Sequence, residues 1–201
     1  FDIDGTFYRG SLYLDVVEHL VKNGLLDSEK VAKHQHQEKM WRSRRHKDTY
    51  NAYLEATVET VVHAMPKLTT EQVEAAARDV VSERNEHVYR YTRDLIASLK
   101  EQGYFLIAIS GSQHEVVSLF VEQYGFDAYT STEWHRTSNG KNYTGDATVR
   151  KNNKEQYLKQ MIDTYDLTIE GSIAVGDSAG DITMLDFVEN PIAFNPEDTL
   201  Y

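Results

Sequence analysis

The sequence predicts an α/β fold in which a doubly wound parallel sheet carries a helical cap inserted after the first strand. From about Tyr104 onward, short apolar runs alternate with stretches of helical periodicity, as in parallel sheets covered by helices on both faces. Residues 11–89 show only helical patterns, directly after a short segment that we interpret as the end of the first strand. We therefore expect an α/β core, residues 1–10 and 90–201, and a cap, residues 11–89.

Residues that begin or end helices divide the predicted cap into separate helices. A first helix ends at Gly24, because glycine readily takes the left-handed conformation that terminates helices. A second helix covers the apolar positions of residues 50–62 and is stopped by Pro66. A third begins after Thr69, a preferred N-cap residue, and Gln72 three positions on predicts a capping box.

The predicted core alternates strands and helices. Its apolar runs predict the buried strands Tyr104–Ile109, Ser172–Val175 and Ile192–Phe194. Its helical periodicity covers Gln113–Tyr124 and Asn152–Tyr165 and returns at Ile182, Leu185 and Val188. Two further runs, Ala128–Trp134 and Asn142–Val149, flank the turn signal Asn139-Gly140, which predicts an antiparallel hairpin.

Composition limits the partners of the chain. A net charge of −11 argues against nucleic-acid binding, and no apolar run approaches the length of a membrane span. The absence of cysteine excludes disulfides and thiolate metal sites and is compatible with the cytoplasmic location that we expect. Because Phe1 opens directly on a motif, we expect the natural chain to extend beyond both ends. The oligomeric state is left open.

Two pairs of aspartates carry the strongest chemical signal. Asp2 and Asp4 stand at the predicted end of the first strand, and Asp177 and Asp181 follow the strand that ends at Val175. Carboxyl ends of parallel strands meet at one edge of a sheet, which is where α/β proteins bind ligands. Four acids gathered there would repel one another unless a cation lay between them. Oxygen ligands alone favour Mg²⁺, completed by water and a substrate phosphate.

Two further segments predict an anion site. Ser110 ends an apolar strand and is followed by Gly111, so a hydroxyl and backbone N–H groups meet at a helix start. Lys154 opens a predicted helix, where a lysine is unfavourable for the helix dipole. That cost suggests a use such as neutralising a phosphate, although a solvated lysine is the commoner case. Lys151 is expected to lie in the preceding loop.

The order of these motifs resembles the haloacid dehalogenase-like hydrolase superfamily. It runs Asp-x-Asp-Gly-Thr, Ser, Lys and Gly-Asp-x-x-x-Asp, at residues 2–6, 110, 154 and 176–181. The helical insertion after the first motif is similar to the branch that includes the phosphoserine phosphatases. This resemblance implies a Rossmann-like core and a magnesium-dependent phosphatase that acts on a small phosphorylated metabolite through an aspartyl-phosphate.

The resemblance also implies roles for individual residues. Asp2 would be the nucleophile and Asp4 the general acid and base, which agrees with what carboxylates do in phosphoryl transfer. The implied ligands of Mg²⁺ are Asp2, Asp4 through its backbone carbonyl, and Asp177, supported by Asp181. The implied substrate-binding residues are Thr6, Ser110, Gly111 and Lys154.

Departures from the phosphoserine phosphatases leave the substrate open. Those enzymes usually carry asparagine where this chain has Gly180, and a glutamate where residues 8–12 stand here. The basic run 41–47 could contact a second anionic group of the substrate, although such runs are more often solvated. His34 and His36 are two apart and do not share a helix face, which argues against a metal site there.

Two alternative functions fit parts of the pattern. A phosphotransferase or phosphomutase would use the same Asp2 chemistry and pass the phosphoryl group to another hydroxyl. A phospho-accepting receiver domain also combines acids, a hydroxyl and a lysine on a doubly wound sheet, but the helical insertion of residues 11–89 argues against it.

Overall fold

The structure, a computed structural model, describes residues 1–26, 28–42, 49–197 and 200. Its strands are β1 (Ile107–Gln113), β2 (Ala128–Arg136), β3 (Tyr143–Thr148), β4 (Ile173–Gly176) and β5 (Asn190–Ala193). β1 pairs in parallel with β2, and β4 pairs in parallel with β5. β2 and β3 form the expected antiparallel hairpin, so this prediction is confirmed.

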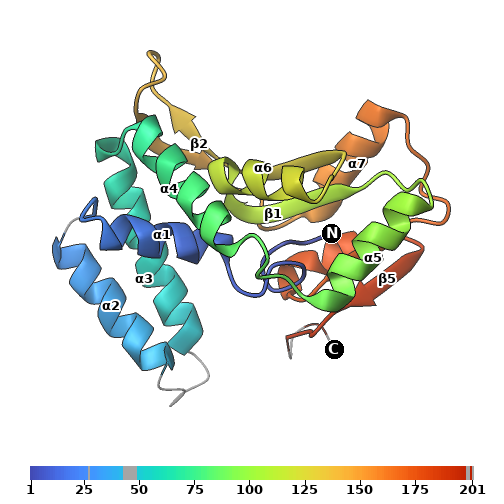
Figure 1. Cartoon of the computed structure of the whole chain (residues 1–201), viewed down its shortest axis with the longest axis horizontal. Coiled ribbons are helices and arrows are strands. Elements are labelled where there is room, and N and C mark those ends of the chain that lie inside the picture. The colour runs from blue at the N-terminus through green and yellow to red at the C-terminus, as the bar shows by residue number, and fades with distance from the viewer. Residues whose placement is uncertain (27, 43–48, 198–199, 201) are drawn as a thin grey trace.

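The first three residues connect these two sets of strands. The Phe1 nitrogen donates to the Ile107 carbonyl at 2.8 Å, and the Ile109 N–H donates to the Phe1 carbonyl at 2.9 Å. On the other side, the Asp2 N–H donates to the Val175 carbonyl at 2.9 Å. Residues 1–3 therefore run between β1 and β4, where the N-terminus lies in Figure 1. The segment after them opens at the carboxyl edge of the sheet.

Helices cover both faces of this sheet, which confirms the doubly wound architecture. α5 (Arg90–Glu101) and α6 (His114–Gln123) contribute Ile96, Leu99 and Phe120 to the larger apolar cluster, together with Ala108 and Val175 of the strands. α7 (Lys154–Tyr165) and α8 (Ile182–Leu185) pack on the opposite face. They form a second, smaller apolar cluster with the strands. Its buried residues are Ile109, Ala174, Met184 and Leu185.

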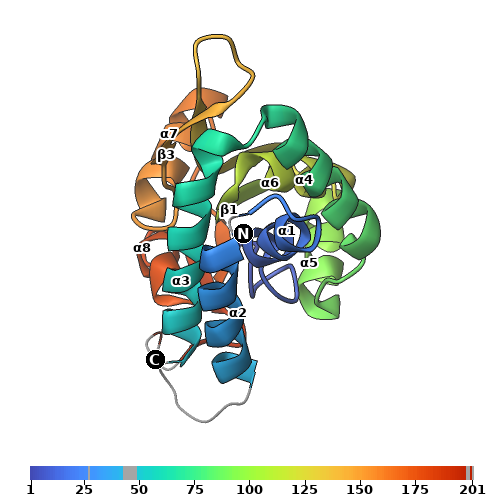
Figure 2. The same cartoon turned by 90° about the vertical axis from the view of Figure 1, so that its left-hand side faces the viewer.

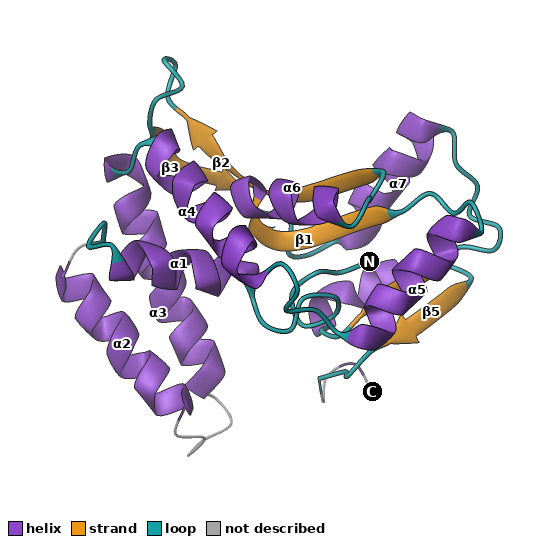
Figure 3. Ribbon diagram, viewed as in Figure 1, coloured by secondary structure: helices purple, strands orange, loops and turns teal. Residues whose placement is uncertain are grey.

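The described part of the segment 11–89 consists mainly of helices, as predicted. It contains α1 (Leu12–Lys22), α2 (Ser28–Arg42), α3 (Thr49–Ala64), a 3-10 turn at Met65–Lys67 and α4 (Thr70–Arg84). The capping box is present, since the Gln72 N–H donates to the Thr69 hydroxyl and the Thr69 N–H to the Gln72 side chain. Figure 2 shows α2 and α3 side by side, and in Figure 3 both lie to the left of β1 and β5. α4 packs on α6, so the larger apolar cluster continues from the helices into the core.

Some boundaries differ from the prediction. The apolar run from Tyr104 enters the sheet only at Ile107, because pairing with β2 begins there, and Tyr104 and Phe105 each remain 37% exposed. β1 instead continues through Ser110 to Gln113. The helix expected to reach Val188 ends at Leu185 and is preceded by a 3-10 turn at Ala179–Asp181. Within the described part of the chain, no helix combines the length and apolarity needed to cross a membrane.

Candidate active site

The acids expected at the sheet edge meet a buried lysine there. Lys154 Nζ donates to Asp2 Oδ1 at 2.5 Å and to Asp181 Oδ1 at 2.7 Å. All three side chains are almost fully buried, at 4%, 7% and 0% exposed. Lys154 is the first residue of α7 and follows Asn153, which has a left-handed conformation at φ 56°. The turn thus directs Lys154 inward, as expected, whereas Lys151 is exposed in the loop.

This cluster contains more carboxyl groups than the Lys154 ammonium can neutralise. Burial raises the pKa of Asp2, and the carboxylate of Asp181 adds to this, although the Lys154 ammonium opposes it. Burial also raises the pKa of Asp177 to about 6. Asp181 differs: burial favours its neutral form, but the Lys154 ammonium holds the pKa of Asp181 below its usual value. A further cation beside these acids would favour the ionised forms of Asp2 and Asp177.

The loop after β4 holds its two aspartates in different ways. Asp181 Oδ2 accepts from the N–H groups of Asp177 and Ser178, at 3.1 and 2.9 Å, and from the Ser178 hydroxyl at 3.0 Å. With Lys154 on Oδ1, both oxygens of Asp181 are engaged by the protein. Asp177 Oδ1 accepts one hydrogen bond at 3.0 Å, from the buried hydroxyl of Thr6. Asp181 therefore shapes the loop, and Asp177 retains an oxygen for a ligand.

Asp4 lies on another side of the cluster. Its Oδ2 accepts from the hydroxyls of Ser110 and Ser112, at 2.9 and 2.8 Å, and its Oδ1 accepts from the N–H of Leu12 at 2.6 Å. Burial raises the pKa of Asp4, and the hydrogen bonds from Ser112 and Ser110 partly offset the shift. A carboxyl with a raised pKa suits a group that must deliver a proton.

Ser112 is a site residue that sequence reasoning missed. It lies two positions after Ser110 in β1, where the pairing with β2 is irregular, and both hydroxyls donate to Asp4. The spacing was a usable signal, but it required knowing that the strand continues past Ser110. The Ser112 hydroxyl also accepts the N–H of Tyr13 at 3.0 Å, which connects the start of α1 to β1.

A divalent cation fits the residues present. One carboxylate oxygen from each of Asp2, Asp177 and Asp181 lies within 4.8 Å of the others. Asp2 Oδ2 is buried and has no hydrogen-bond partner among the described residues. Such an orphaned acceptor is costly unless a cation or donor meets it. The Asp4 side chain is not part of this group.

Comparison with known proteins identifies the family. A sequence model described as haloacid dehalogenase-like hydrolase matches residues 1–186. The chain belongs to this family. Phosphoserine phosphatase of Methanocaldococcus jannaschii is 28% identical over 136 residues, covering 66% of this chain and 61% of that protein. The match thus spans less than two thirds of the relative's length.

Solved structures share the fold of this haloacid dehalogenase-like hydrolase. A Bordetella pertussis Tohama I protein of unknown function has a TM-score of 0.78 at 17% identity, with coverage of 100% of this chain and 90% of the other. A phospho-aspartyl intermediate analogue of phosphoserine phosphatase has a TM-score of 0.65 at 22% identity, with 100% and 87% covered. The family and fold expected from the sequence are therefore confirmed.

The structure explains one departure from the phosphoserine phosphatases. A side chain at Gly180 would place its Cβ 2.9 Å from the backbone carbonyl oxygen of Lys151. The backbone of the loop before α7 therefore occupies the space that the side chain of an asparagine at this position would need. Arg44, Arg45 and the rest of 43–48 lie outside the described residues. The side chains of His34, Trp41 and Arg42 are likewise not described.

Gly5→Ala is expected to damage the acid cluster of this hydrolase. The new Cβ would lie 2.3 Å from Asp177 Oδ2, and φ at Gly5 is +88°. Gly24→Ala is a matched control, because Gly24 also has a positive φ, +68°, but no atom within 4 Å of the Cβ position. Both variants should lose about 1 kcal/mol or more from backbone strain. Only Gly5→Ala should lower turnover, by at least about tenfold. Equal turnover in the two variants would show that the approach of Gly5 to Asp177 is unimportant.

Proposed function

We propose that this chain is a magnesium-dependent phosphatase that hydrolyses a small phosphomonoester through an aspartyl-phosphate at Asp2. The observation that carries the proposal is the position of Asp2. Its Oδ1 meets Lys154, and its buried Oδ2 has no hydrogen-bond partner among the described residues. One oxygen of Asp2 also lies within 4.8 Å of a carboxylate oxygen of Asp177. A carboxylate at a cationic centre, on a rigid sheet edge, suits attack on an anionic phosphoryl group.

Phosphoryl transfer would proceed in two steps. The Asp2 carboxylate attacks phosphorus, and the bond from phosphorus to the leaving oxygen breaks while the Asp4 carboxyl gives that oxygen a proton. Asp4 then takes a proton from water as the water attacks phosphorus, which releases phosphate and restores the Asp2 carboxylate. Lys154 would hold a phosphoryl oxygen, together with Ser110 and the Gly111 N–H. Mg²⁺, held by Asp2, Asp177 and the Asp4 carbonyl, would supply positive charge to the phosphoryl oxygens.

The class of substrate follows from which parts of the protein surround the phosphoryl group and its leaving group. Lys154 supplies positive charge at the site, which fits a phosphate ester. The helices of residues 11–89 are proposed to act as the cap that contacts the leaving group and excludes water. Phosphoserine, the substrate named for the relative, is not favoured, because Gly180 offers no amide and Lys151 occupies the adjoining space.

Hydrolysis and transfer can be separated directly. The chain should release inorganic phosphate from p-nitrophenyl phosphate with Mg²⁺ present. Added small alcohols should leave the ratio of phosphate to p-nitrophenol at one. A ratio that falls as alcohol is added would identify a phosphotransferase instead. Accumulation of a stable phospho-Asp2 without turnover would point to a receiver-like protein.

Magnesium dependence should be assigned mainly to Asp177. Chelation should abolish turnover and added Mg²⁺ should restore it. Asp177→Asn should weaken Mg²⁺ binding by about 10- to 100-fold or more, because Asp177 has an oxygen free for the metal. Asp181→Asn should chiefly lower the melting temperature, because both Asp181 oxygens hold Lys154 and the loop. Magnesium titration by calorimetry and thermal melts of both variants measure this; a normal magnesium affinity in Asp177→Asn would refute the assignment.

A further inference from the structure

The start of α5, where the chain returns from the helical segment to the core, meets the segment just after β5. Two aromatic side chains from this start contact Phe194. The Tyr91 ring is stacked on the Phe194 ring, with 5.6 Å between the centroids and 3° between the planes. The Tyr89 ring meets Phe194 edge to face at 5.0 Å. We call these three residues the aromatic clamp, because the two tyrosines hold Phe194 against the start of α5.

Phe194 belongs to a segment that holds the backbone of Asp177. The Phe194 N–H donates to the Gly176 carbonyl at 2.9 Å, and the Glu197 N–H donates to the Asp177 carbonyl at 2.8 Å. These two hydrogen bonds follow directly on the pairing of β4 with β5, which ends at Gly176. The aromatic clamp therefore fixes the segment whose N–H groups hold Asp177 from the side of its backbone.

A second connection runs from the same start of α5 to the side chain of Asp177. The hydroxyl of Thr92 is fully buried and lies 3.1 Å from the Thr6 carbonyl, closer than its 3.3 Å from the Tyr89 carbonyl. The hydroxyl of Thr6 donates to Asp177 Oδ1 at 3.0 Å. Thr92 thus holds the backbone of Thr6, and Thr6 holds the carboxylate of Asp177.

A metal ligand depends on such connections. Mg²⁺ demands near-ideal octahedral geometry, and residues that hold its ligands from behind influence its affinity. Asp177 Oδ1 accepts one hydrogen bond from the described residues, that of Thr6. If the clamp and Thr92 only closed the core, removing them would lower the melting temperature and leave the Mg²⁺ affinity as it was. A positioning role predicts a loss of Mg²⁺ affinity.

We propose that Thr92 and Phe194 are positioning residues for Asp177 and set the affinity of the site for Mg²⁺ without touching the metal or the phosphoryl group. This inference rests on the proposed function, since it takes Asp177 as a metal ligand. The start of α5 then acts on that ligand by two routes, through Thr6 on its side chain and through the aromatic clamp on its backbone.

The route through Thr6 is tested by Thr92→Val, which removes the hydroxyl and keeps the size of the side chain. Calorimetry should show Mg²⁺ binding weakened by about threefold or more, whereas Thr92→Ser, which keeps the hydroxyl, should bind Mg²⁺ like the wild type. Thr60→Val is the matched control, because Thr60 is also a buried helical threonine and its hydroxyl donates to the Ala56 carbonyl at 2.7 Å. It should lower the melting temperature and leave the Mg²⁺ affinity unchanged.

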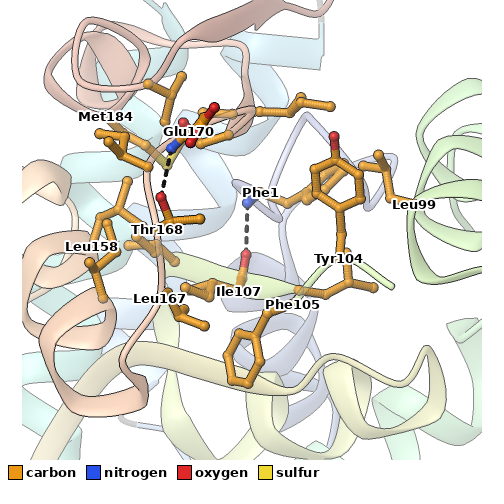
Figure 4. A pocket seen from close by; sticks show the side chains of 18 of the residues that line it. Phe1, Leu99, Tyr104, Phe105, Ile107, Leu158, Leu167, Thr168, Glu170 and Met184 are labelled. Atoms are coloured by element: carbon orange, nitrogen blue, oxygen red, sulfur yellow. Dashed lines mark hydrogen bonds between the residues drawn. The ribbon is translucent and has the colours of Figure 1, made fainter. Parts of the chain in front are cut away.

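The route through the clamp is tested by Phe194→Leu, which removes the ring contacts and keeps an apolar side chain. Mg²⁺ binding should weaken by about threefold or more, and amide hydrogen exchange at Glu197 should become at least about tenfold faster in the metal-free protein. Phe105→Leu is the matched control. Phe105 packs on Tyr165 at 4.9 Å just before β1, beside a cavity of about 380 Å³ at the end of the strands opposite to the aspartates (Figure 4). It should change neither readout.

A double variant shows whether the effect passes through Asp177. In an Asp177→Asn background, Thr92→Val should weaken Mg²⁺ binding by less than about twofold further, because the ligand that it positions is already lost. An undiminished effect in that background would overturn the proposal. So would wild-type Mg²⁺ affinity in both Thr92→Val and Phe194→Leu, and this result would leave the proposed phosphatase standing. A wild-type chain that binds no Mg²⁺ would instead overturn the proposed function and this inference together.

Discussion

Asp2→Asn is expected to lower turnover of p-nitrophenyl phosphate by about 10⁴-fold or more, because an amide is a poor nucleophile and a weaker ligand for a cation. The fold should persist. The asparagine keeps the size of the buried side chain, and Lys154 keeps its bond to Asp181 Oδ1 at 2.7 Å. Burial also raises the pKa of Asp2, so removal of its charge costs less than removal of an ordinary paired carboxylate would.

The matched control is Asp163→Asn, which changes an exposed aspartate of α7. It should leave both turnover and melting temperature unchanged. Trapping the intermediate gives a direct test: acid-quenched wild-type protein should carry base-labile phosphate at Asp2, and Asp2→Asn should carry none. Near-normal turnover in Asp2→Asn, in protein with an intact circular dichroism spectrum, would exclude covalent catalysis by this residue.

Lys154→Met is expected to have the next largest effect. The variant keeps most of the apolar side chain but removes the charge between Asp2 and Asp181, two nearly buried carboxylates. Loss of a charged contact to the transferred group should lower turnover by about 10²- to 10³-fold. Leaving buried acids without their cation should also destabilise the fold, by about 3 kcal/mol or more. Thermal melts and initial rates measure the two effects.

Lys151→Met is the matched control, because it makes the same substitution at a lysine that lies exposed in the loop just before α7. It should lose little turnover and no stability. Magnesium adds a discriminating readout. Since Lys154 and the metal neutralise the same acids, saturating Mg²⁺ should recover part of the lost stability in Lys154→Met, while turnover stays low. A larger loss of turnover in Lys151→Met than in Lys154→Met would reverse the assignment of the phosphate-binding lysine.

The sequence determined where many elements begin and end, because their signals are local. Thr69 and Gln72 form the capping box that their spacing predicted, and Gly24 has the left-handed conformation expected after a helix. The turn at Asn139-Gly140 joins β2 and β3, with Gly140 at φ 68°. α2 and α5 were not predicted as separate helices, although the buried residues of α5, Thr92, Ile96 and Leu99, recur at helical spacing. The sequence of α2 has no continuous apolar stripe, so periodicity could not single it out.

Motif order also indicated which residues gather, since the carboxyl ends of neighbouring parallel strands share an edge. Only the tertiary structure decided how they pair. Lys154 meets Asp2, 152 positions away, and Asp181, 27 positions away. Ser112 joins Ser110 on Asp4 because β1 continues beyond the apolar run. Partner choice depends on strand register and on the left-handed turn at Asn153, and a residue's type does not encode either of them. Composition and spacing thus determine which chemical groups are present. Packing determines which oxygen of each carboxylate remains free to bind a ligand.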